Sequence, residues 1–181
     1  MDSNFDRDKW RQQAWRRFQR ASQRTCKKPP ARGAEAQWHR DMLYIEKLST
    51  LIDWCTARRL TVRFAKREAG VFEPDTRTVT VSCRAAPERQ LHYILHEVGH
   101  FLIGHVADDP RFGKGYPQVY NKELNRKYIH KLTCLEEEFE AWHRGWKLST
   151  RLHLDLDRNE FDLTRLACLK SYIGWTSTSG K

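Results

Sequence analysis

The feature that most constrains this chain is a pair of histidines four residues apart, with a glutamate directly after the first. His96, Glu97 and His100 have the spacing His-Glu-x-x-His, which is typical of helices that bind zinc. On a helix, side chains at positions i and i+4 lie one above the other on the same face. His96 and His100 are therefore predicted to bind one metal ion. Glu97, about 100° round the helix from His96, is predicted to act on a metal-bound water without being a ligand.

The segment around this pattern is predicted to be an amphipathic helix from Pro87 to Gly104. Proline suits the first helical position because its missing N–H needs no partner there, and Glu88 places a favourable negative charge in the first turn. The two histidines are expected to face a cleft, because the apolar side chains fall in an arc on the opposite side of the helix. These are Leu91, Ile94, Leu95, Val98, Phe101 and Leu102.

Composition indicates one globular domain with a basic tail. The chain has 181 residues, of which 39% are hydrophobic and 31% charged, and no apolar run has the length of a membrane span. No hydrophobic secretory signal follows Met1. We therefore expect a cytoplasmic protein that makes no membrane contact. The five cysteines are widely spaced and predict reduced thiols rather than disulfides: Cys26, Cys55, Cys83, Cys134 and Cys168.

The basic charge is concentrated in an N-terminal arm. Residues 1–32 hold ten lysines or arginines against three aspartates, whereas the rest of the chain holds 23 basic and 20 acidic residues. Trp10, Trp15 and Phe18 have helix-like spacing among the arginines. Two interpretations stay open: a helix that contacts nucleic acid or an acidic partner, and a helix that packs on the body. We divide the chain into arm and linker (1–33) and a zincin-like domain (34–181).

The remaining patterns predict an α+β fold in which a small antiparallel sheet lies beside the His-Glu-x-x-His helix. An extended peptide could pair with an edge of such a sheet. The segment from Asp108 to Tyr128 is expected to be irregular, and two interpretations stay open: a lid that crosses the site, and a surface excursion without a functional role. Strands are predicted at 60–64, 70–73 and 77–82, and further helices at 38–59, 132–148 and 158–173.

A catalytic zinc site needs a third protein ligand. His105 is excluded because it falls on the arc away from His96 and His100 while the helix continues. Glu138 is the better candidate, because it lies in line with small residues that let a neighbouring helix approach closely. These small residues are Cys134, Ala141 and Gly145, whereas the other glutamates of this segment, Glu136, Glu137 and Glu140, are expected to be solvated.

Three features together resemble the ImmA/IrrE-type metallopeptidases, a gluzincin-like group of bacteria, phages and mobile elements. They are the segment from His96 to His100, the Val79-Thr80-Val81 strand before it, and the downstream string Glu138-Phe139-Glu140-Ala141. The resemblance covers about residues 60–150, and residues 141–148 look most like small phage-borne relatives. It implies a zincin-like fold, a Zn²⁺ cofactor, Glu138 as the third ligand, and a protein substrate.

The expected chemistry is hydrolysis of a peptide bond by a metal-activated water, with Glu97 as the general base. A second donor to the oxyanion is expected. His92 is expected either to contact a metal ligand from behind or to line the cleft. The candidates for the donor remain open: Tyr116, Tyr120, His130 and His143.

Three other interpretations are kept. SprT-like proteases also combine His-Glu-x-x-His with basic segments and act on DNA-associated proteins, but they need a third histidine. A catalytically silent zincin-fold protein could bind a host partner, although it would have no use for Glu97 as a base. A nucleic-acid-binding protein with a structural zinc would show salt-sensitive binding to DNA.

Overall fold

A computed structural model of the chain describes residues 34–66, 70–106, 123 and 127–177. The predicted arm and linker (1–33) and most of the predicted lid (108–128) lie outside these residues. No helix in the described part is long and apolar enough to cross a bilayer. The elements are α2 (Ala34–Ala57), β1 (Thr61–Ala65), β2 (Val71–Glu73), β3 (Thr78–Ser82), α3 (Pro87–Phe101), the π-helix η1 (Leu102–Val106), α4 (Tyr128–Arg151) and α5 (Arg158–Ser177).

The three strands form one mixed sheet in the order β1-β3-β2. β2 and β3 are antiparallel, as predicted, with Phe72 opposite Val79. The expectation of an entirely antiparallel sheet is wrong for the other pair, because β1 runs parallel to β3 with Val62 opposite Val79. The middle three residues of β3 are all buried, which suits a central strand with a neighbour on each side. β2 is left as an edge strand.

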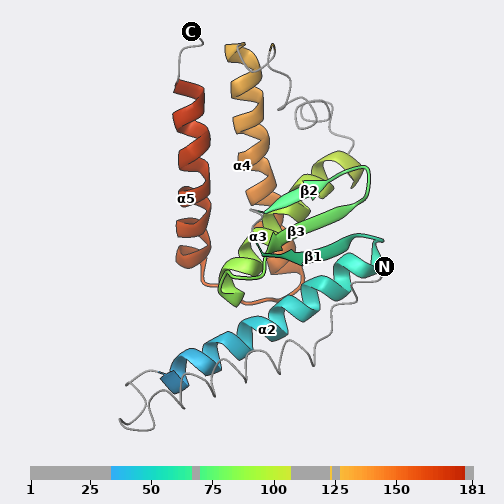
Figure 1. Cartoon of the computed structure of the whole chain (residues 1–181), viewed down its shortest axis with the longest axis vertical. Coiled ribbons are helices and arrows are strands. Elements are labelled where there is room, and N and C mark those ends of the chain that lie inside the picture. The colour runs from blue at the N-terminus through green and yellow to red at the C-terminus, as the bar shows by residue number, and fades with distance from the viewer. Residues whose placement is uncertain (1–33, 67–69, 107–122, 124–126, 178–181) are drawn as a thin grey trace.

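The helix α3 lies between the sheet and α4, and α2 crosses the lower end of the molecule in Figure 1. The apolar arc predicted for α3 is buried, apart from Leu102, which is partly buried. It packs with the inner face of the sheet and with the apolar stripe of α2. Alternation in the strands places Val62, Phe72, Val79 and Val81 in this core. The core therefore holds α3 firmly along the side opposite its histidines.

On its other side α3 lies so close to α4 that backbone atoms of the two helices are in van der Waals contact. A Cβ atom built on Gly99 would lie 2.0 Å from the carbonyl oxygen of Ala141, and one built on Gly145 would lie 2.5 Å from that of Leu95. Small residues are therefore required on both helices. The predicted seam of small residues on α4 is confirmed, and Gly99 is its counterpart on α3. This contact determines how close residues of α4 come to His96 and His100.

The ends of α3 and α5 are stabilised by polar side chains. Arg144 donates from Nη1 to the carbonyl oxygen of Leu102, at 2.8 Å, where α3 changes into η1. Asp157 accepts hydrogen bonds from the backbone N–H groups of Asn159 and Glu160 and so begins α5, as its sequence predicts. The helix extends to Ser177 and does not end before Gly174 as expected. α4 and α5 lie side by side as two rods (Figure 1).

Candidate metal centre

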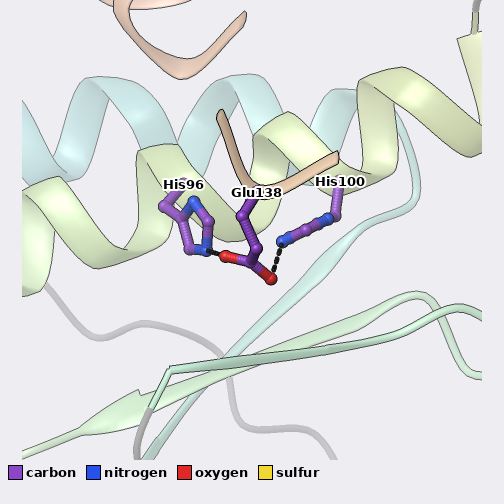
Figure 2. Close-up of side chains that lie close together, drawn as sticks. All are labelled: His96, His100 and Glu138. Carbon is purple, nitrogen blue, oxygen red and sulfur yellow. Dashed lines mark ion pairs between the residues drawn. The ribbon is translucent and has the colours of Figure 1, made fainter. Parts of the chain in front are cut away.

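Three side chains from two helices meet where α3 and α4 approach each other. The Nε2 atom of His96 lies 3.1 Å from Oε2 of Glu138, and the Nε2 atom of His100 lies 3.5 Å from Oε1 of the same carboxylate (Figure 2). One ligand atom from each residue falls within 4.8 Å of the other two. His96, His100 and Glu138 are 8%, 4% and 2% exposed. The structure thus brings together the three predicted ligands, buried rather than facing an open cleft.

The spacing of these atoms suits a zinc ion. Zinc binds histidine nitrogen and carboxylate oxygen at about 2.0–2.2 Å in a tetrahedron, which places neighbouring ligand atoms roughly 3.3 Å apart. The two nitrogen–oxygen distances of 3.1 and 3.5 Å lie on either side of this value. Two imidazoles and one carboxylate are also the ligand set of many catalytic zinc sites. The three residues therefore offer the ligand chemistry of a zinc site, with their ligand atoms gathered within 4.8 Å of one another.

The site strongly perturbs the proton affinities of its members. Burial alone would lower the pKa of His100, but its contacts with Glu137 and Glu138 outweigh that effect and raise the pKa to about 10. Burial acts in the opposite sense on Glu138, yet its contacts with His100 and His96 hold the pKa of Glu138 well below its usual range. The carboxylate is therefore ionised, as a metal ligand must be.

Glu97 lies next to the three candidate ligands but does not belong to their group. Its Oε1 atom is 4.0 Å from Nε2 of His96, and its carboxylate accepts a hydrogen bond from the backbone N–H of Phe72 on β2. A Cβ atom on Gly70 would lie 2.8 Å from the same Oε1 atom, so the absence of a side chain there leaves room for Glu97. Burial raises the pKa of Glu97, and its Oε2 atom has no hydrogen-bond partner among the described residues.

The glutamates around Glu138 differ from the prediction most clearly at Glu137. Glu136 is exposed, as expected, and Glu140 is partly buried and paired with Arg144. Glu137 was expected in solvent but is 4% exposed, and its Oε1 atom lies 3.5 Å from Nδ1 of His100. The reason is the close approach of α3, which covers a wider arc of α4 than a helical wheel of α4 alone indicates.

The other candidate residues have different surroundings. His92 belongs to the packing between α3 and α5, because its Nδ1 atom lies 3.0 Å from Oγ1 of Thr164 and its ring lies against Phe161. His130 is buried, with its Nε2 atom 3.6 Å from Sγ of Cys134. His143 is exposed on α4. Tyr116 and Tyr120, and the side chain of His105, lie outside the described residues.

A tyrosine on the last helix also contacts the site. Tyr172 of α5 forms a side-chain hydrogen bond with Glu138, and burial together with this negative charge raises the pKa of Tyr172. The phenol is therefore neutral and donates to the carboxylate. Sequence reasoning predicted the helix but assigned no role to this residue. Its position one turn after Cys168, on the same helix face as buried Phe161 and Leu169, is the signal that it points inward.

A scan against protein-family models, a search of curated proteins and a search of solved structures each returned no match to the chain.

Proposed function

We propose that the protein is a zinc-dependent metallopeptidase of the ImmA/IrrE type, which hydrolyses a peptide bond in a protein substrate. One observation supports this proposal above all others. Glu138 of α4 reaches both histidines of the His-Glu-x-x-His helix, at 3.1 and 3.5 Å, while Glu97 stays outside the ligand group with a buried oxygen that lacks a described partner. A purely structural metal site does not require a carboxylate such as Glu97, which lies beside the ligands without binding the ion.

His96, His100 and Glu138 would hold the ion. An ion held there would supply Lewis-acid chemistry: it would lower the pKa of a coordinated water to about 7 and polarise a substrate carbonyl. Glu97 then takes the proton from the attacking water and transfers it to the leaving amine, a task for which its raised pKa is suited. The neutral hydroxyl of Tyr172, which donates to Glu138 in the free protein, would turn its proton to the oxyanion during the reaction.

Two further features favour this proposal over the alternatives. SprT-like proteases need a third histidine, whereas the third donor here is the carboxylate of Glu138. In addition, the edge strand β2 is linked to the site through the hydrogen bond between Phe72 and Glu97. An extended peptide that pairs with this strand would therefore pass close to the general base.

The test is a comparison of the parent with Glu97→Gln, using a library of peptides from a digested bacterial proteome and mass spectrometry of the products. The parent loaded with zinc should cleave a subset of peptides, and a chelator should abolish the cleavage. Glu97→Gln should retain about one zinc per chain and lose hydrolysis, because it lacks the base. Tyr172→Phe should retain zinc and lower kcat by about 100-fold.

Glu136→Gln is the matched control, because Glu136 is exposed on α4; its cleavage rate should equal that of the parent. Equal cleavage by Glu97→Gln and the parent would contradict the proposal. A parent that binds zinc but cleaves nothing in the library or in cell extract would favour a zincin fold that acts by binding.

A further inference from the structure

The two histidines of the candidate metal centre are held in place by different means. The ring of His96 stacks on Trp142, with the ring centroids 4.4 Å apart and an angle of 20° between the planes. Its Nδ1 atom is buried and has no hydrogen-bond partner among the described residues. The Nδ1 atom of His100 lies at an ion-pair distance of 3.5 Å from the carboxylate of Glu137. Packing therefore orients one ring, whereas a charged group orients the other.

Two adjacent glutamates on α4, Glu137 and Glu138, each contact one ring nitrogen of His100. Glu138 faces Nε2 of His100 at 3.5 Å, and Glu137 faces Nδ1 of the same ring, also at 3.5 Å. Glu137 is buried, and a buried carboxylate is costly unless it has a partner. No other ion pair of its side chain is seen among the described residues. Each ring nitrogen of His100 thus lies near a different carboxylate of α4.

We infer that Glu137 is a positioning residue for the metal centre, because it holds the proton of His100 on Nδ1 and leaves Nε2 to bind the ion. A carboxylate in this position also makes the ring a stronger ligand, and loss of such a partner commonly weakens metal binding by about 10-fold to 100-fold. The inference rests on the proposed zinc site, and it adds a fourth residue to the set that determines its affinity.

The first test is a titration of metal-free protein with Zn²⁺ in competition with a chromophoric chelator. Glu137→Gln preserves size and removes the charge, and it should raise the Kd for zinc by about tenfold or more. Glu136→Gln removes the same charge from the neighbouring exposed position and should leave the Kd unchanged. Circular dichroism of the metal-free variants establishes that both are folded. Equal affinity of Glu137→Gln and the parent would overturn the inference.

The second test requires no variant and applies even if Glu137→Gln fails to fold. Long-range ¹H–¹⁵N spectra of the zinc-loaded parent distinguish a protonated imidazole nitrogen from a metal-bound one. His100 should carry its proton on Nδ1 and bind through Nε2; binding through Nδ1 would overturn the inference. A parent that binds no zinc would instead refute the proposed function, and a parent that binds zinc without hydrolysis would leave this inference standing.

Discussion

Two polar clusters lie on α3, and they differ in one essential respect. Near the start of the helix, Arg40 of α2 pairs with Glu88 at 2.8 Å and with Glu160 of α5, which also accepts a hydrogen bond from Tyr44. The side chain of Arg40 is 43% exposed. Both carboxylates of this cluster form ion pairs with it. In the second half of α3, the candidate metal centre is buried, and it contains three carboxylates but only two imidazoles.

The difference shows what the buried cluster lacks. Ionised carboxylates are tolerated inside a protein when they are paired or when they bind a metal. Glu138 is ionised and Glu137 contacts His100, while Glu97 keeps one buried oxygen without a described partner. No arginine or lysine contributes to the cluster among the described ion pairs, in contrast to Arg40 at the other end. A bound divalent cation would supply the missing positive charge.

The largest expected effect concerns the helix contact that creates the buried cluster. Gly99→Ala would place a Cβ atom 2.0 Å from a backbone oxygen of α4, and backbone atoms cannot move aside as a flexible side chain can. We expect the free energy of unfolding to fall by about 3 kcal/mol or more, in the upper range for overpacking. Chemical denaturation of metal-free protein measures the change.

Gly174→Ala is the control for this substitution, because nothing lies within 4 Å of a Cβ atom at that position on α5. It should stabilise the protein by up to about 1 kcal/mol through helix propensity alone. Equal effects of the two substitutions would show that α3 and α4 are not in close contact.

The next effect contrasts a carboxylate from each cluster. Glu138→Gln removes a proposed metal ligand, and the Kd for zinc should rise by more than the roughly 100-fold known for loss of outer-shell partners. Glu160→Gln removes a carboxylate of the exposed cluster and should leave zinc binding unchanged. Isothermal titration calorimetry on both variants makes the comparison. Retention of parental affinity by Glu138→Gln would move the third ligand elsewhere.

The third prediction concerns the pH dependence of stability, which His92, between the two clusters on α3, is expected to influence. Burial lowers the pKa of His92 to about 4 from its ordinary value of 6.5. The unfolded chain therefore binds an extra proton between these values, and stability falls as the pH is lowered from about 6.5 to 4. The shift corresponds to about 3 kcal/mol at most.

Denaturation of metal-free protein at pH 7 and pH 4 tests this prediction. The parent should lose up to about 3 kcal/mol more than His92→Gln over this interval. Identical pH dependence of the two proteins would mean that folding does not lower the pKa of His92.

The smallest effect is expected in the exposed cluster. Arg40→Met breaks the ion pairs with Glu88 and Glu160, and we expect a loss of less than about 1 kcal/mol, because solvent screens exposed pairs. The loss should shrink further in high salt. Thermal unfolding at low and high ionic strength gives both values. A loss of stability as large as that of Gly99→Ala would show that the exposed cluster contributes as much to stability as the buried helix contact.

Much of the site could be predicted because its signals are local. The spacing of His96 and His100 needs only helix geometry, and the seam of small residues at Ala141 and Gly145 indicated that another helix would come close to Glu138. The burial of Glu137 could not be predicted in the same way. It depends on how widely α3 covers α4, which is a property of two helices together.

The remaining differences have similar causes. Period-two alternation identified β1 and β3, and a short strand was also predicted at β2. These patterns carry no information about strand order, and the parallel pairing of β1 with β3 was therefore missed. The contact of Tyr172 with Glu138 depends on the angle at which α5 packs on α4, and the helix pattern of α5 does not define that angle.

The proposed metal site is tested most simply by anomalous diffraction at the zinc absorption edge, from crystals of the protein grown with Zn²⁺. One strong peak is expected between the Nε2 atoms of His96 and His100 and the carboxylate of Glu138. The absence of a peak at that position, or a strong peak bound only by other residues, would contradict the proposed site.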